Sequence, residues 1–189
     1  DSEIDVLKEL GVNFKTGVEV GKDISLDELR AQGFKAFYLA IGAQKGRLLG
    51  IEGEDAAGVI TGVDFLREEN LNETKSLSGK VIVIGGGNVA IDVARMAVRA
   101  GGKEVSMFCL EKREEMPALP EEIHEAEEEG IKITNSWGPK RILVKDGKVS
   151  GVEFKKCVSV FDKDGKFSTA ENEQVYNNAF INLRNYYYY

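Results

Sequence analysis

Two spacings of apolar residues divide the first 41 positions into short helices and strands. Residues 2–10 carry apolar side chains at every third position, which predicts a helix. A serine and a glutamate three residues apart, at positions 25 and 28, predict a capping box at the start of a second helix. Apolar runs predict a strand pair in residues 12–20 and a buried strand in residues 36–41.

The pattern changes after a polar stretch at residues 71–80, which indicates a boundary. Residues 81–84 are four consecutive β-branched residues, as in a strand covered on both faces. The next predicted elements are a helix over 88–100, a strand over 105–110, a helix over 120–129 and a strand over 131–134. Asp-Gly pairs at 146–147 and 164–165 predict two hairpins. This order predicts an α/β fold, with a Rossmann-like parallel sheet followed by a β-meander.

Composition narrows the classes of function. The chain has 189 residues and a formal net charge of −7, and this acidity disfavours a nucleic-acid binder. Its longest apolar run is too short for a transmembrane helix, so we expect no membrane partner. Two distant cysteines, Cys109 and Cys157, and a single histidine predict no metal site and a reducing, cytoplasmic location. Because the chain begins at Asp1, we expect it to be processed or part of a longer protein.

The candidate chemistry lies in a glycine-rich segment that fits G-x-G-x-x-G/A. The predicted cofactor-binding residues there are Gly85, Gly86, Gly87, Asn88, Val89 and Ala90. Gly85 makes a tight turn, Gly87 lets the backbone approach a pyrophosphate, and Ala90 lets the helix pack close to the strand. The motif follows a predicted strand and opens a predicted helix, within a 30-residue unit at 81–110. The alternative is a glycine-rich turn that binds nothing.

The residues after the second predicted strand decide whether the site accepts the 2′-hydroxyl of NADH or the 2′-phosphate of NADPH. Glu111 stands 21 residues after Ala90, where a carboxylate accepts a hydrogen bond from the 2′-hydroxyl of NAD and repels a 2′-phosphate. Lys112 and Arg113 follow and offer positive charge to such a phosphate. We therefore predict an NAD(P)H site that leans toward NADH. A solvated turn remains the alternative for this segment.

No side chain is predicted to be catalytic. His124 lies on a helix crowded with acids, which favours an ordinary surface histidine. Cys109 lies inside a predicted strand and reads as a small buried hydrophobic residue.

Several segments together resemble the glutamate synthase small-subunit family. They are the Gly-Gly-Gly-Asn-Val-Ala-Ile-Asp-Val-Ala-Arg and Arg-Glu-Glu-Met-Pro-Ala stretches within residues 81–120, residues 37–43 and 50–54, and residues 158–166. The family comprises FAD- and NAD(P)-dependent oxidoreductases with two dinucleotide folds, and the resemblance covers residues 1–168. This sequence departs from the family pattern at Leu110 and Glu111, where NADPH-using members carry basic residues. It also departs at Arg184 and in the Tyr186–Tyr189 tail.

The resemblance implies a discontinuous FAD-binding domain that holds an inserted NAD(P)-binding domain. Residues 1–61 would be a partial FAD-binding domain, 62–155 the NAD(P)-binding domain, and 156–189 the start of the return to the FAD domain. It also implies flavin contacts from Ile41, Gly42 and Ala43. Hydride would pass from the nicotinamide to FAD, and electrons would go on to iron–sulfur centres or a partner subunit. This transfer needs no side-chain acid or base, because the cofactors carry the chemistry.

Two other classes of function stay open. One is a non-catalytic nucleotide-binding or docking module, whose surface would be the acidic stretch at residues 111–130. The other is a self-contained dehydrogenase, disfavoured because no substrate domain is visible. Within the resemblance, the missing parts of the enzyme would lie in the same polypeptide or in a partner subunit, and this chain alone would be inactive.

Overall fold

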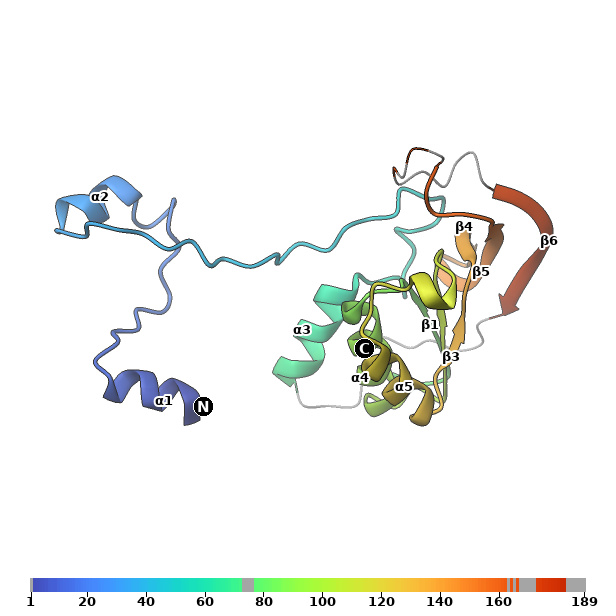
Figure 1. The fold of residues 1–189 in the computed structure, drawn as a ribbon, viewed down its shortest axis with the longest axis horizontal. Helices are drawn as coiled ribbons and strands as arrows, with labels where there is room; N and C mark the ends of the chain where they lie inside the picture. The colour runs from blue at the N-terminus through green and yellow to red at the C-terminus, as the bar shows by residue number, and fades with distance from the viewer. Residues whose placement is uncertain (1, 73–76, 163, 165, 167–172, 183–189) are drawn as a thin grey trace. The chain divides into compact units, whose positions relative to one another are not determined.

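The structure is a computed structural model that describes residues 2–72, 77–162, 164, 166 and 173–182. The chain divides into two units, Asp1–Gly42 and Ala43–Tyr189. Its helices are α1 (Ser2–Glu9), α2 (Leu26–Ala31), α3 (Gly62–Asn72), α4 (Asn88–Arg99), a 3-10 helix η1 (Arg113–Glu115) and α5 (Pro120–Glu128) (Figure 1). Its strands are β1 (Lys80–Ile84), β2 (Glu104–Phe108), β3 (Lys132–Thr134), β4 (Trp137–Lys145), β5 (Lys148–Cys157) and β6 (Glu173–Asn182).

The first unit contains the two predicted helices. The capping box that begins α2 is confirmed, because the Ser25 hydroxyl accepts from the Glu28 N–H at 3.1 Å and the Glu28 carboxylate accepts from the Ser25 N–H at 2.8 Å. Gly33 follows α2 with φ +102°, a left-handed conformation that favours glycine. Neither helix has a buried residue.

The strands predicted in the first unit are wrong. Residues 36–41 are extended but belong to no strand, and residues 12–20 contribute only one isolated bridge, between Val20 and Ile24. A strand exists only when a neighbouring backbone accepts its hydrogen bonds. Among the residues that the structure describes, no strand pairs with these segments. Their apolar composition gave no information about a partner.

The second unit is built on the parallel sheet that the β-branched run predicts. Its strand order is β1-β2-β3, with Ile84 of β1 opposite Phe108 of β2. Sequence analysis missed α3, which precedes β1. A signal for it exists, because the Thr61 hydroxyl accepts from the Asp64 N–H at 3.3 Å, as a helix-capping threonine does.

Alternate residues of β1 and β2 face two different layers. Val83 and Met107 belong to a buried cluster on the side of α4, which packs on both strands. Ile84 and Phe108 face the other way and pack against β5. The Phe108 ring stacks on that of Phe154, with centroids 4.1 Å apart. The parallel sheet therefore lies between α4 and the antiparallel sheet (Figure 1).

The antiparallel sheet is the predicted β-meander, with strand order β4-β5-β6. Asp146 and Gly147 form its first turn with φ +53° and +76°, which confirms the hairpin predicted at this Asp-Gly pair. The second predicted hairpin, at residues 164–165, lies partly outside the described residues, and so do Arg184 and the Tyr186–Tyr189 tail. None of the described helices is long and apolar enough to cross a membrane.

Candidate dinucleotide-binding site

The glycine-rich segment forms the turn between β1 and α4. Gly85 has φ +147°, and a methyl group there would lie 3.0 Å from the Ala90 Cβ. Its N–H donates to the Phe108 carbonyl at 2.9 Å, so the turn is tied to β2. Gly85 and Ala90 therefore need to be small, as the dinucleotide fingerprint requires.

The amino end of α4 presents backbone donors. Gly87 is the N-cap of α4, and no side chain caps the helix there. A methyl group on Gly87 would meet no atom within 4 Å, so the space above this residue is open. Uncapped N–H groups and the positive end of the helix dipole favour a negatively charged ligand at this point.

Asn88 connects the glycine-rich turn to the segment before α5. Its Oδ1 accepts from the Leu119 N–H at 2.9 Å, and the Gly86 carbonyl accepts from the Ala118 N–H at 3.2 Å. Ala118 is buried beside the loop. The Asn88 side chain thus binds the segment before α5, and its predicted contact with the cofactor stays a prediction, as does that of the exposed Val89.

Glu111 lies over the glycine turn. A methyl group on Gly86 would come 2.7 Å from the Glu111 Oε2 and 3.1 Å from the Cys109 Cβ. The carboxylate therefore lies against the middle glycine of the motif, as expected for a group that contacts the ribose of a bound dinucleotide.

The two basic residues after Glu111 are engaged elsewhere. Lys112 pairs with Glu115 at 3.3 Å, and Arg113 pairs with Glu127 of α5 at 2.7 Å. Both basic side chains are about half exposed, so these pairs are weak and exchange easily with water. In this arrangement Glu111 is the charged group nearest to the glycine turn among these three.

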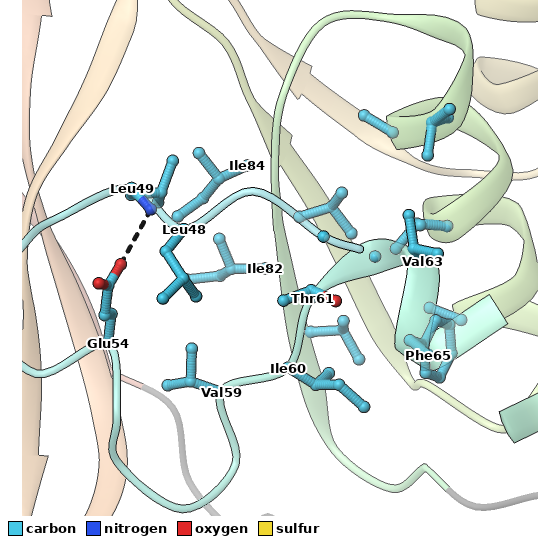
Figure 2. Close-up of a pocket in the computed structure, with 18 of the residues that line it drawn as sticks. Leu48, Leu49, Glu54, Val59, Ile60, Thr61, Val63, Phe65, Ile82 and Ile84 are labelled. Carbon is cyan, nitrogen blue, oxygen red and sulfur yellow. Dashed lines mark hydrogen bonds between the residues drawn. The ribbon is translucent and has the colours of Figure 1, made fainter. Parts of the chain in front are cut away.

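A cavity of about 510 Å³ extends along β1 beside the loop. Figure 2 shows Ile82 and Ile84 of β1 on one side of it and Leu48, Val59 and Ile60 from the segment before α3 around it. Gly87, Val89 and Ala90 line its end at α4. The Glu54 carboxylate accepts from the Leu49 and Gly50 N–H groups at 2.9 Å each, which shapes the loop above (Figure 2).

The residues predicted to contact flavin, Ile41, Gly42 and Ala43, lie where the first unit ends and the second begins. Ile41 is 80% exposed, and Gly42 has φ +65°. Ala43 is also exposed. Their predicted role stays a prediction. Within the described part of the chain, no group of three or more metal-ligating side chains is arranged to hold an ion.

Cys109 lies beside the glycine turn, and its thiol is expected to react slowly. Burial, reinforced by the charge of Glu111, raises the pKa of its thiol to about 11. The Asn135 Nδ2 donates to the Cys109 Sγ at 3.2 Å. The prediction that this cysteine is a buried hydrophobic residue is confirmed, since only 2% of it is exposed.

The raised pKa of Cys109 predicts slow thiol chemistry. With a pKa of about 11, roughly 0.1% of the thiol is ionised at pH 8, against roughly 10% at the ordinary value of 9.0. In a Cys157→Ser variant, whose only cysteine is Cys109, we expect labelling by a disulfide reagent to be at least about 100-fold slower than after unfolding in urea. The rate should keep rising up to pH 10; a plateau below pH 9 would contradict the shift.

Comparison with known proteins identifies the family. Residues 2–168 match the family described as pyridine nucleotide-disulphide oxidoreductase. The chain belongs to this family. It is 41% identical over 155 residues to the NADPH-Fe(3+) oxidoreductase subunit beta of Geobacter sulfurreducens (strain DL-1 / KN400), a match that covers 80% of this chain and 23% of that protein.

The resemblance to glutamate synthase small subunits is confirmed as well. The Escherichia coli (strain K12) glutamate synthase [NADPH] small chain is 35% identical over 161 residues, covering 79% of this chain and 34% of that protein. The chain thus spans about a quarter to a third of the length of these relatives.

A solved structure supports the fold of this chain. Mycobacterium tuberculosis FprA in complex with NADPH matches with a TM-score of 0.71 and 20% identity, covering 87% of this chain and 51% of that one. The predicted fold class, α/β with a Rossmann-like parallel sheet, is confirmed by this match and by the strand order.

Proposed function

We propose that this chain is the NAD(P)H-binding part of a flavin-dependent oxidoreductase. One observation carries the proposal: the turn between β1 and α4 leaves Gly87 open above an uncapped helix end, with the Glu111 carboxylate lying against Gly86. A dinucleotide needs both features, an approach for its pyrophosphate and a reader for its ribose. The pyrophosphate would lie on Gly87 and accept from the first N–H groups of α4.

The ribose position favours NADH over NADPH. The Glu111 carboxylate would accept from a 2′-hydroxyl and repel a 2′-phosphate, and the nearby Lys112 and Arg113 are paired with glutamates. The relatives are named for NADPH. Our proposal therefore gives this chain a different cofactor preference from these relatives and attributes the difference to Glu111, where it can be tested.

For hydride transfer, this chain would only have to position the dinucleotide and keep water away from its nicotinamide ring. Gly87 is one of the residues that line the mainly apolar cavity along β1, and this cavity would receive the nicotinamide end of the dinucleotide. No side chain would have to give or take a proton, because the bound cofactors would supply the hydride chemistry.

In the full-length protein we propose that the hydride passes to FAD and that electrons continue to iron–sulfur centres or a partner subunit. The described residues contain one glycine-rich dinucleotide turn, so we assign no flavin-binding step to them. Residues 1–61 would belong to the FAD domain, 62–155 to the NAD(P) domain and 156–189 to the return. We propose a reducing compartment such as the cytoplasm, because Cys109 and Cys157 are both buried thiols.

Calorimetric titration with NADH, NADPH and FAD in separate experiments tests this function. We expect micromolar binding of NADH, weaker binding of NADPH and negligible retention of FAD. If neither nicotinamide dinucleotide binds, the proposed function is wrong. Tight stoichiometric flavin would instead contradict the assignment of residues 1–61 to part of an FAD domain.

Reversing the charge of Glu111 tests the ribose assignment. In a Glu111→Arg variant we expect the ratio of the NADPH and NADH dissociation constants to move toward NADPH by at least about tenfold, or about 1.4 kcal/mol. Glu114→Arg, the same charge reversal at an exposed position three residues further on, is the control and should leave the ratio unchanged. An equal shift in both variants would mean a general charge effect.

A further inference from the structure

The main chain of Glu111 is held by a short segment that follows β3. The Glu111 carbonyl accepts from the Ser136 N–H at 3.0 Å and from the Asn135 Nδ2 at 3.3 Å. Ser136 has φ +64°, a left-handed conformation that is rare for a serine. A strained residue persists only where its surroundings hold it, and here its N–H reaches Glu111 in that conformation.

Asn135 contacts the Glu111 carbonyl through its side chain, whereas Ser136 contacts it through its backbone N–H. The Asn135 amide also donates to the Cys109 Sγ at 3.2 Å, so one side chain bridges two residues at the carboxyl end of β2. The main chain there is already anchored, because the Cys109 N–H donates to the Thr134 carbonyl at 3.1 Å and the Trp137 N–H to the Cys109 carbonyl at 2.9 Å. Glu111 lies two residues beyond that anchor, where its carbonyl accepts from Asn135, from Ser136 and from the Cys109 thiol at 3.7 Å.

We propose that Asn135 is a positioning residue that sets the choice between NADH and NADPH by fixing the Glu111 carboxylate over Gly86. The inference rests on the proposed dinucleotide site. Without the amide, the peptide after Glu111 keeps only the Ser136 N–H and the weak thiol donor, and the carboxylate loses its fixed direction. Its hydrogen bond to a 2′-hydroxyl weakens, and its repulsion of a 2′-phosphate falls as well. The two dissociation constants therefore respond differently.

The test compares NADH and NADPH binding in wild type and in Asn135→Ala and Asn135→Asp. For Asn135→Ala we expect the NADH dissociation constant to rise about fivefold while that of NADPH stays the same or falls, the loss expected for one amide hydrogen bond. The aspartate keeps the size of the side chain and removes its donor, but it also adds a negative charge that repels a 2′-phosphate. For Asn135→Asp we therefore expect at least the same rise for NADH, and the NADPH constant is compared in Asn135→Ala alone. Asn70→Ala is the matched control, because the Asn70 Nδ2 also donates to a carbonyl, that of Leu66 on α3, away from the site. It should leave both constants unchanged.

A second measurement separates positioning of Glu111 from general support. When Glu111 is already serine, adding Asn135→Ala should not change the NADH to NADPH ratio further, because the carboxylate that it positions is gone. Equal weakening of both dinucleotides by Asn135→Ala, or a shift that persists in the Glu111→Ser background, would overturn the inference. So would loss of cooperative thermal unfolding in both variants, which indicates a purely structural role. Failure of wild type to bind either dinucleotide would contradict the proposed function instead.

Discussion

Replacing Gly87 by alanine should abolish dinucleotide binding and leave the fold intact. The new methyl group would meet no protein atom within 4 Å, and the φ of −94° and ψ of 174° at this position suit any residue. Exchanging glycine for alanine at a helix N-cap costs less than about 1 kcal/mol. A pyrophosphate lying on the Gly87 backbone would collide with the same methyl group, so only the ligand is affected.

We expect the NADH dissociation constant of Gly87→Ala to rise at least about 100-fold, or about 2.7 kcal/mol. Calorimetry measures the binding, and thermal unfolding followed by circular dichroism measures the fold. Gly86→Ala is the contrasting variant, because its methyl group would come 2.7 Å from the Glu111 Oε2 and therefore displaces that carboxylate. If Gly87→Ala binds NADH as wild type does, the glycine turn is not the dinucleotide site.

The local part of this site could be predicted from the sequence. A β-branched run, three glycines and a helix are contiguous, so their spacing alone specifies a strand, a turn and a helix. The place of Glu111 over Gly86 also follows from its count along the chain, because the carboxyl ends of neighbouring parallel strands meet at one edge.

The parts that could not be predicted depend on distant partners. The strand expected at residues 36–41 is absent, because apolar composition does not report whether another backbone lies alongside. The support that Asn88 gives to Leu119 and that Asn135 gives to Glu111 joins residues 31 and 24 positions apart. Nothing in the local pattern marks those two asparagines. The helix α3 is a different case, because a local signal, the threonine and aspartate three residues apart at positions 61 and 64, marks its beginning.

The largest loss of stability is expected from Phe154→Ala. Phe154 is fully buried on β5, and its ring stacks on Phe108 of β2 at an interplanar angle of 19°. This stack lies in the small cluster that joins the antiparallel sheet to the parallel sheet. Removing a buried phenylalanine ring leaves a cavity and costs about 3–5 kcal/mol.

Urea unfolding measures this loss, and Trp137 provides a local signal. It is the only tryptophan in the chain and packs against the same cluster, so its fluorescence reports on the joint between the sheets. Phe34→Ala is the matched control, because Phe34 is 56% exposed and its truncation should change stability by no more than about 0.5 kcal/mol. A loss below about 1 kcal/mol in Phe154→Ala would mean that the two sheets do not depend on this contact.

The same variant connects stability to the dinucleotide site. The Phe108 carbonyl accepts from the Gly85 N–H, so the strand that carries the stack also holds the glycine turn. NADH at 100 times its dissociation constant should stabilise wild type by about 2.7 kcal/mol, because it binds only the folded chain. If the weakened stack leaves the turn intact, Phe154→Ala should gain as much from NADH as wild type does. A smaller gain at the same NADH concentration would show that loosening the joint between the sheets also loosens the turn.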